Sequence, residues 1–437
     1  MASAGGSPAR GFKPFRLERV VSMRILLATY WEVPSTTGVG TYIRNIRHGL
    51  EALGHTVDIL AHDAKTSCVC KSGGSQPVAE HWFKNHIRST LAAYYANTLK
   101  VTDSLVLFRE TERYAFELAA SLLQPQDYDL VQTHDVISCR ALSRLLPRTV
   151  PLVGRFGGWL TQEMSTYGQA QGAQLQRYLA LEERLGLLSA PYRFVPSHWL
   201  KQVFVQSFGL PPETIKVVHS GVRVDEVLRK AAEQPDPAPP ADGRLVILCP
   251  ARLAPYKGQR LLLEAVAEIA KQRRDFVCWL AGEGPMQPAL EAQVRDLGIG
   301  SHVLFLGNRE DVHALMARAD LVVLPSLLDS LPHAVQEAQV IGKPVVAFET
   351  CGLPEMIVHG DTGLLVGQQT GPALAQALER LLANPDWRRR LGNRAASWGR
   401  AHWSAKRMTE ETVAIYRDAA EAHRKATQSF PKGGHRA

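Results

Sequence analysis

Residues 321–348, LVVLPSLLDSLPHAVQEAQVIGKPVVAF, show in one stretch how this chain is built. Two short apolar runs, LVVLP and KPVVAF, have the pattern of strands, and a longer segment lies between them. Pro332 fits best at the first turn of a helix and restricts the residue before it. We therefore expect a loop over residues 326–331 and a helix over 332–341, joining two parallel strands.

Two acids, Asp329 and Glu337, flank the start of this helix with seven residues between them. Asp329 is expected in the loop, and Glu337 more than one turn into the helix, where its long side chain can reach a ligand. A helix N-terminus offers free amides and a partial positive charge, which suit a phosphate. The acids would then bind something else, such as sugar hydroxyls. A solvated acid at a helix start and an unrelated surface glutamate would give the same pattern.

Both halves of the chain repeat the alternation of strand-like and helix-like segments. The strand-like runs of the first half are RILLAT, TVDIL, DLVQT, PLVGRF, YRFVP and IKVV. Those of the second half are RLVILCP, DFVCWLAG, HVLFLG, LVVLP, KPVVAF and GLLV. Such alternation predicts an α/β fold of two Rossmann-like domains with doubly wound parallel sheets. Ligands bind at the carboxyl ends of such strands, so we expect the site in the cleft between the domains.

A chain of 437 residues exceeds what one hydrophobic core usually serves. We place the first domain at residues 23–230, a proline-rich hinge at 231–243 and the second domain at 244–398. Residues 399–437 are expected to form a helix that crosses back to the first domain, followed by a basic tail. Residues 1–22 precede the first clear strand and are expected to be a disordered extension or the product of an overcalled start.

The net charge of +8 is concentrated near the two ends. Residues 1–22 contribute +3 and residues 424–437 contribute +4, which leaves about +1 for the body and does not indicate a nucleic-acid-binding surface. Phe12, Phe15 and Leu17, interleaved with basic residues, give weak support for contact with a membrane surface. No apolar run approaches the roughly 18 residues of a membrane span.

The six cysteines are scattered. Cys249 and Cys278 fall inside apolar strand-like runs, where a reduced, buried thiol is the usual explanation, and no pair has zinc-site spacing with suitable partners. We therefore expect a cytoplasmic protein.

Two cationic residues, Arg252 and Lys257, follow the strand-like run RLVILCP in the segment ARLAPYKG. Between a strand and a helix, two long cationic side chains can converge on a diphosphate. Surface charge would explain either residue alone. Their combination with the acid pair 72 residues later favours one shared site.

The motifs of the chain occur in a recognisable order. They are TTGVGTYIRNI, THD, HSGV, ARLAPYKG, LAGEGP, the Asp-x7-Glu segment, GKPVVA and DTGLLV. This order resembles that of the retaining glycosyltransferases of family 4, also called group 1, which have the two-domain GT-B fold. The resemblance runs from residue 23 to about 403 and is more specific in the second half. It implies transfer of a hexose or N-acetylhexosamine from a nucleoside diphosphate sugar to a hydroxyl acceptor, with no metal ion and no cofactor beyond this co-substrate.

By this resemblance, Arg252 and Lys257 bind the donor diphosphate and stabilise the charge on the leaving group. Glu337 holds the donor ribose, and Asp329 takes the place of the family's first glutamate beside the transferred sugar, one methylene shorter. His134 matches a family histidine near that sugar. Further donor contacts are implied for Gly38, Gly40, Gly282, Leu331, Pro332, His333 and Ala334. Weaker candidates, which strand-end structure would also explain, are Asp135, Arg155 and Gly221.

The donor and acceptor stay open at this point. UDP-N-acetylglucosamine and UDP-glucose are favoured as donors, with GDP-mannose as the alternative. The acceptor is a small cyclitol or aminocyclitol, or a polysaccharide or lipid-linked intermediate, and the low charge of the body favours a soluble small molecule. A long helical stretch at residues 80–125 would either shape the acceptor pocket or form a structural helical pair.

Three other readings are open. A GT-B sugar-nucleotide epimerase would share the architecture, and a non-catalytic binding module would not need the full set of charged residues. A dinucleotide-binding enzyme is indicated by GVGTYI after the first strand and by Asp58, which lies 20 residues after Gly38. The third glycine of that fingerprint is absent, however, and Asp58 falls inside a strand-like run.

Overall fold

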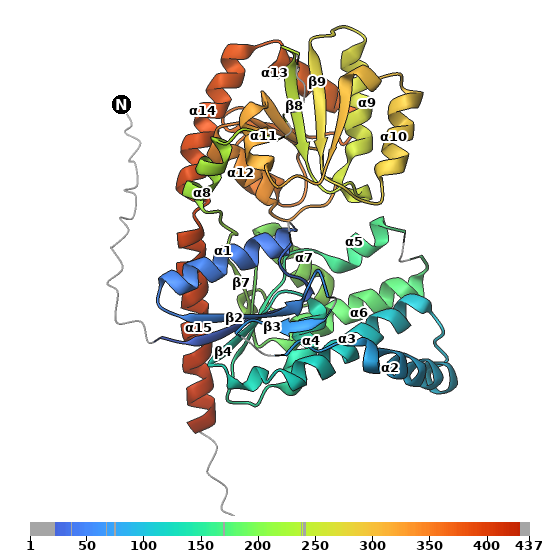
Figure 1. The fold of residues 1–437 in the computed structure, drawn as a ribbon, viewed down its shortest axis with the longest axis vertical. Coiled ribbons are helices and arrows are strands. Elements are labelled where there is room, and N and C mark those ends of the chain that lie inside the picture. Colours follow the sequence, from blue (N-terminus) through green and yellow to red (C-terminus); the bar gives the residue numbers. More distant parts are fainter. Residues whose placement is uncertain are drawn as a thin grey trace, which may run out of the picture.

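Two sheets, one in each half of the chain, organise the fold (Figure 1). The computed structural model describes residues 22–428 except 36, 67, 74–75, 169–170, 237 and 239–241. The predicted extension at residues 1–22, with the membrane contact assigned to it, lies outside the described residues apart from Ser22. The end of the predicted basic tail, from residue 429, also lies outside them.

The first sheet has seven strands in the order β3-β2-β1-β4-β5-β6-β7, all parallel except that β3 runs antiparallel to β2. The strands are β1 (Arg24–Glu32), β2 (Thr56–His62), β3 (Val69–Lys71), β4 (Leu130–Thr133), β5 (Leu152–Arg155), β6 (Tyr192–Val195) and β7 (Ile215–Val217). The helices are α1 (Gly38–Ala52), α2 (His81–Tyr94), α3 (Ser104–Leu122), α4 (Val136–Leu145), α5 (Leu160–Thr166), α6 (Ala173–Ser189) and α7 (His198–Phe208). There are also a short π-helix, η1 (Tyr95–Leu99), and two 3-10 helices, η2 (Pro125–Asp127) and η3 (Pro212–Thr214). The stretch predicted to be helical at 80–125 is therefore helical, as the pair α2 and α3.

The second sheet has six parallel strands in the order β10-β9-β8-β11-β12-β13. They are β8 (Leu245–Pro250), β9 (Phe276–Ala281), β10 (Val303–Gly307), β11 (Leu321–Leu324), β12 (Val345–Phe348) and β13 (Gly363–Val366). The helices are α8 (Val224–Ala231), α9 (Gln259–Ala270), α10 (Gln287–Asp296), α11 (Val312–Arg318), α12 (His333–Ile341), α13 (Gly371–Leu382) and α14 (Pro385–His402), with turns η4 (Pro255–Lys257), η5 (Gly300–His302) and η6 (Leu353–Glu355). Strand order reverses at β8 and β11, which opens a crevice for ligand at the carboxyl ends of these strands.

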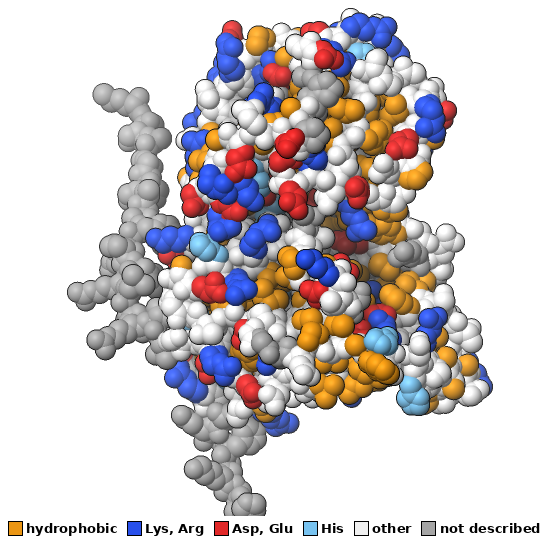
Figure 2. All heavy atoms as spheres, in the orientation of Figure 1, with side chains coloured by type: hydrophobic (Ala, Val, Ile, Leu, Met, Phe, Trp, Pro, Cys, Tyr) orange, Lys and Arg blue, Asp and Glu red, His pale blue; other side chains and the backbone are white. Residues whose placement is uncertain are grey.

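The central strands are apolar along their whole length because helices cover both faces of each sheet. In β11, Leu321 and Val323 pack into the core on one face, and Val322 and Leu324 pack into the core on the other. The first sheet is likewise enclosed by two cores. On the face drawn in Figure 2, acidic and basic side chains intermix instead of forming an extended patch of one sign. Among the described helices, none is long and apolar enough to cross a membrane.

The chain passes between the domains at two adjacent places, near residues 222 and 404, which lie eight residues before and six residues after the predicted boundaries at 230 and 398. Val222 already packs in the core of the second domain, as does Val227 of α8, so the crossing precedes the proline-rich segment 231–243. The proline content of that segment marks a surface loop, because prolines suit exposed irregular backbone wherever it occurs.

The return crossing lies at Ser404, between α14 and α15 (Ala405–Gln428). Val222 donates its N–H to the Trp403 carbonyl at 2.9 Å and accepts from the Ala405 N–H at 3.0 Å, so the two crossings form one connection. Helix α14 stays with the second domain, and α15 packs on α1 and β5 of the first, which confirms the predicted crossover helix (Figure 1).

Candidate functional site

The loops after β8 and β11 lie on the side of the second domain that faces the first domain (Figure 1). Contacts across this boundary come from both loops. The Tyr256 ring of η4 packs edge-on against Tyr167 of the first domain with ring centroids 5.7 Å apart, and the Ser330 and Ser197 hydroxyls are hydrogen bonded at 2.8 Å. The predicted donor-binding residues therefore line an interface between the domains.

Lys257 and Asp329, which are far apart in sequence, form an ion pair in this interface. The Lys257 Nζ donates to Asp329 Oδ2 at 2.5 Å, and each side chain is only 15% exposed. Gly258 allows the two loops to meet, because a Cβ on it would lie 1.9 Å from the Pro325 carbonyl oxygen and its φ is +69°. The acid predicted to contact the sugar thus also neutralises the cation predicted to bind diphosphate.

Arg252 is exposed and lies two residues after the end of β8. Its carbonyl oxygen accepts from the Gln259 side chain at 2.9 Å, which ties the loop to the start of α9. Gly282, at the end of β9, packs against the same loop, since a Cβ there would lie 2.2 Å from the Ala251 carbonyl oxygen. The close approach of two strand ends explains why a glycine stands at position 282, and its predicted contact with the donor stays a prediction.

Helix α12 begins one residue later than predicted. Pro332 has extended dihedrals and serves as its N-cap residue, so the helix starts at His333. Leu331 is buried, whereas Pro332, His333 and Ala334 are half-buried at the helix N-terminus. The amide end of α12 consequently borders the Lys257 and Asp329 pair, as a phosphate site requires.

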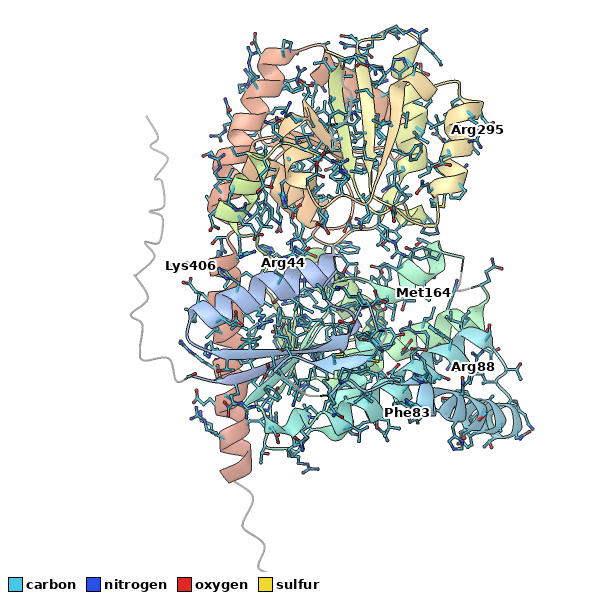
Figure 3. All side chains as sticks on the ribbon, in the orientation of Figure 1. Arg44, Phe83, Arg88, Met164, Arg295 and Lys406 are labelled. Carbon is cyan, nitrogen blue, oxygen red and sulfur yellow. The ribbon has the colours of Figure 1, made fainter. Side chains whose placement is uncertain are left out.

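Glu337 lies further along α12 and has a different partner from Asp329. Its Oε1 is 3.4 Å from His313 Nε2, and both side chains are 13% exposed. Burial alone would raise the pKa of Glu337, but the neighbouring His313 imidazole and the charges of His333 and Arg44 outweigh burial and lower it. Arg44 belongs to α1 of the first domain, on the side of that helix turned to the second domain (Figure 3). An ionised carboxylate in this place can accept hydrogen bonds from ribose hydroxyls.

Glu163, which sequence reasoning missed, extends the charged cluster from the first domain. It lies on α5, the helix marked by Met164 in Figure 3. Burial raises its pKa to about 7, while the charges of Lys257 and Arg252 oppose the shift and that of Asp329 adds to it. No motif surrounds Glu163 in the sequence, and its place after β5 was the one signal that could have found it.

His134 directly follows β4 and is buried, with 3% exposure. Its Nε2 is 3.3 Å from the Gln132 side-chain nitrogen, and its ring lies 5.4 Å from that of Tyr42. Burial and the charge of Arg155 hold the pKa of His134 well below its ordinary value, so the ring is neutral. The predicted contact of His134 with the donor sugar stays a prediction.

Three of the other candidate residues have contacts that explain them structurally. The Asp135 carboxylate caps α4 by accepting the Ser138 N–H at 2.8 Å. Arg155 stacks over the Tyr42 ring at 3.7 Å and donates to the Ser220 hydroxyl at 3.0 Å. A Cβ on Gly221 would lie 2.6 Å from the Ser404 carbonyl oxygen, so this glycine permits the close packing of the two crossings.

The glycine loop before α1 differs between its two members. Thr37 caps the helix by accepting the Gly40 N–H at 3.3 Å, and a Cβ on Gly40 would lie 2.5 Å from the Ser35 carbonyl oxygen. Gly38 has open space where a Cβ would be. Contact of these amides with a ligand stays a prediction.

Asp58, the acid on which the dinucleotide-binding hypothesis depends, has a structural role. Asp58 accepts hydrogen bonds from the Tyr128 hydroxyl at 2.8 Å and from the Ser72 hydroxyl at 3.1 Å, within the first sheet. Its carboxylate is thus engaged in holding β2 to neighbouring segments. Asp58 and Gly40, two of the residues that suggested a dinucleotide fingerprint, thus have structural explanations.

Two family models match the chain. The model described as Glycosyl transferases group 1 matches residues 231–398, and the one described as Glycosyltransferase Family 4 matches residues 36–226. Alpha-D-kanosaminyltransferase of Streptomyces kanamyceticus is 32% identical over 40% of this chain and 46% of its own length. The GDP-mannose-dependent alpha-(1-6)-phosphatidylinositol monomannoside mannosyltransferase of Mycolicibacterium smegmatis is 29% identical over 47% of this chain and 57% of its own length. The chain thus spans about half the length of these two curated relatives.

A solved structure extends the likeness to the whole chain. Anabaena Alr3699/HepE in complex with UDP superimposes with a TM-score of 0.62 and 18% identity, covering 91% of this chain and 100% of that one.

Proposed function

Since the chain belongs to the group 1, family 4 glycosyltransferases and has their GT-B fold, we propose that it transfers a sugar from a nucleoside diphosphate sugar to a hydroxyl acceptor. The observation that carries the proposal is the ion pair of Lys257 with Asp329, four residues before the first residue of α12, together with the charge of Arg252, which acts on Glu163 as that of Lys257 does. Two cations and a helix N-terminus aimed at one place form a site for a diphosphate.

The proposed chemistry follows from where charge develops. As the bond between sugar and diphosphate breaks, negative charge grows on the leaving phosphate and positive charge on the sugar. Lys257, Arg252 and the α12 amides stabilise the phosphate, and these fixed charges take the part that a divalent ion would otherwise play. When Lys257 turns to phosphate, Asp329 is released to accept a hydroxyl of the transferred sugar. We expect the anomeric configuration to be retained.

For the substrates, we favour a UDP-sugar and a soluble hydroxylated acceptor, such as a cyclitol or aminocyclitol. The binding of UDP by the structural neighbour Alr3699/HepE supports the first, and the low net charge of the body of the chain supports the second. The mannosyltransferase relative supports the alternatives, GDP-mannose and a lipid-linked acceptor.

Thermal unfolding with nucleotides tests the donor site. We would measure the midpoint with UDP, GDP, ADP or NAD for the wild type, Lys257→Ala and Glu337→Ala, with Lys271→Ala as the control because Lys271 is an exposed lysine paired with Glu268. One nucleoside diphosphate should stabilise the wild type and the control, by about 2.7 kcal/mol at a hundredfold excess over Kd, and should lose most of this effect in both site variants. Stabilisation by NAD alone, or by none of the four, would contradict the proposal.

Product analysis separates transfer from epimerisation. With UDP-glucose, UDP-N-acetylglucosamine or GDP-mannose, nucleotide release that depends on the acceptor and yields a glycoside supports transfer. Release of nucleotide without acceptor, together with an altered sugar stereochemistry, would identify an epimerase.

A further inference from the structure

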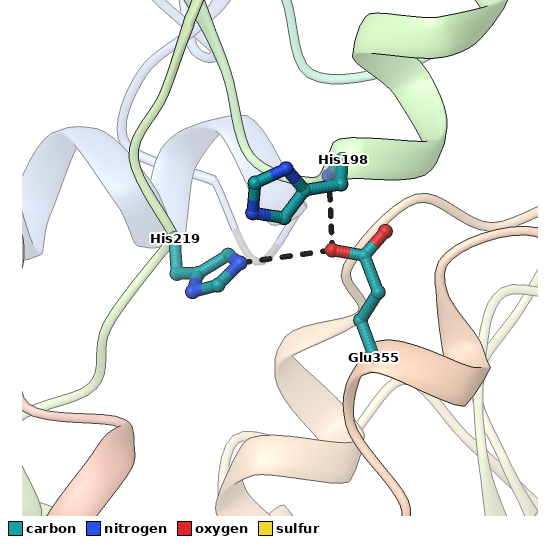
Figure 4. A group of neighbouring side chains, drawn as sticks. All are labelled: His198, His219 and Glu355. Carbon is teal, nitrogen blue, oxygen red and sulfur yellow. Dashed lines mark hydrogen bonds and ion pairs between the residues drawn. The ribbon is translucent and has the colours of Figure 1, made fainter. Parts of the chain in front are cut away.

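Two histidines and a glutamate from both domains meet beside the crossing at Val222 (Figure 4). His198 is the first residue of α7, His219 follows β7, and Glu355 ends η6 of the second domain. One nitrogen of each histidine and one carboxylate oxygen lie within 4.8 Å of one another. The three donors face a common point, and none of these residues is part of the proposed diphosphate site.

The Glu355 carboxylate is fixed in place and charged. Its Oε2 accepts the His198 N–H at 2.9 Å, and its Oε1 accepts the Trp199 N–H at 2.6 Å. Burial would raise the pKa of Glu355, but the neighbouring His219 imidazole and these two amides lower it. Each carboxylate oxygen still has a lone pair available after accepting one N–H.

His219 presents a sheltered nitrogen to the same point. Its Nε2 has no hydrogen-bond partner in the part of the chain that the structure describes, and it lies 3.7 Å from Glu355 Oε2. The His198 ring is beside it, with ring centroids 5.9 Å apart and planes at 75°. A sheltered polar atom without a partner calls for an explanation, and a bound cation would supply one.

We propose that His198, His219 and Glu355 bind a zinc ion that bridges the two domains. Two imidazoles and one carboxylate are a donor set that Zn²⁺ prefers, with water as the fourth ligand. Bonds of about 2.0–2.2 Å in a tetrahedral site place donors roughly 3.4 Å apart, close to the His219 to Glu355 separation. The remaining adjustment falls to His198, whose exposed side chain can rotate toward the ion.

The zinc site is connected to the donor side of the cleft through one residue. Ser220, next to His219, accepts from Arg155 at its hydroxyl, and its carbonyl accepts from the Gln336 side chain of α12 at 2.6 Å. An ion that holds His219 against Glu355 therefore stabilises the present arrangement of α12 against the first domain. The ion acts as a bridge between domains and takes no part in sugar transfer.

Zinc titration of chelator-treated, dialysed protein tests this inference. Isothermal titration should give one site per chain, and zinc should raise the unfolding midpoint. The His198→Ala/His219→Ala variant should bind zinc at least about tenfold more weakly. The matched control is His48→Ala/His86→Ala, which removes two exposed histidines from α1 and α2 and should bind zinc like the wild type.

A second variant tests zinc binding in case the double histidine variant fails to fold. Glu355→Gln keeps an oxygen that can accept from the start of α7 but removes the charge, and it should also weaken zinc binding about tenfold or more. Cobalt substitution should give the visible absorption of a tetrahedral or five-coordinate site in the wild type and in the control. Equal zinc affinity in all variants, or no binding by the wild type at micromolar zinc, would overturn the proposal.

Discussion

Lys257 and Asp329 neutralise each other in a place where both are largely shielded from water. Removing one member of such a pair leaves the other charge uncompensated, which is costly in a desolvated position. A bound diphosphate would relieve that cost by pairing with Lys257 in turn. The ion pair therefore stabilises the free protein but weakens donor binding, because Lys257 must leave Asp329 to pair with the diphosphate.

Asp329→Asn should lower the unfolding midpoint of the free protein and enlarge the stabilisation produced by the preferred nucleoside diphosphate. Transfer should nevertheless fall by about tenfold or more, because the sugar hydroxyl loses a charged acceptor. Calorimetry with and without nucleotide, together with kcat, measures both effects. Asp386→Asn removes an acid of an exposed ion pair and should change neither.

Glu163 should make donor binding depend on pH. The pKa of Glu163 is about 7 in the folded protein against an ordinary 4.5, so folding favours the protonated carboxyl. This favourable contribution is complete below about pH 4.5 and is lost as the pH rises through about 7. Above that value the ionised group also competes with phosphate for Lys257 and Arg252.

Glu163→Gln should therefore flatten the fall in donor affinity between about pH 6 and about pH 8 while leaving the affinity at the lower pH nearly unchanged. Titration calorimetry with an intact nucleotide sugar at several pH values measures the donor affinity of both proteins. Any protonation of the ligand itself affects both proteins equally. Identical profiles for the two proteins would show that Glu163 does not face the bound donor.

At the scale of elements, α12 and its preceding loop are held by the turn before η6. Gly352 donates its N–H to the Asp329 carbonyl oxygen at 3.1 Å. A Cβ on Gly352 would lie 1.5 Å from the Ser330 carbonyl oxygen, so only glycine allows this approach. The position of Asp329 thus depends on a segment that follows the next strand.

Gly352→Ala should displace the loop at Ser330, lower the unfolding midpoint and weaken nucleotide binding about tenfold or more. Gly300→Ala provides the comparison, because Gly300 has open space at the Cβ position and an ordinary φ. The prediction would be wrong if both variants bound nucleotide equally well. Thermal unfolding and nucleotide titration of the two proteins give the answer.

At the scale of the whole molecule, α15 joins the last residues of the second domain to the core of the first. Tyr416, which is fully buried on α15, donates its hydroxyl to the Gln132 side-chain oxygen of β4 at 2.5 Å. Gln132 in turn lies beside His134. The C-terminal helix therefore completes the polar interior of a domain built from the N-terminal half.

Tyr416→Phe should reduce the free energy of unfolding of the first domain by about 1–2 kcal/mol, because Gln132 loses a buried donor while the ring still fills its space. Nucleotide binding should stay unchanged, since the proposed donor residues of the second domain are untouched. Chemical denaturation followed by a probe in each domain distinguishes the two. A change confined to the second domain would contradict the assignment of α15.

The sequence was sufficient for the fold class and most strands, because these depend on local patterns. Apolar runs such as β11 are buried on both faces, and Pro332 marks the start of α12 within one residue. Arg252, Lys257 and Asp329 could be chosen as candidates because each follows a strand within a motif, and Glu337 because it lies eight residues further on from Asp329 in the Asp-x7-Glu segment. Their ordering in the chain was enough to predict a shared site.

Only the tertiary structure determined which residues from distant parts of the sequence come into contact. Glu163 belongs to the charged cluster only because α5 packs against η4. The chain crosses between the domains near Val222 because the apolar residues of α8 pack in the second domain. Gly352, His219 and Glu355 likewise gained their roles from segments distant in sequence. A strand or helix follows from residues near one another along the chain. Charge compensation, close backbone approach and ligand geometry depend instead on distances in space, which only the folded chain sets.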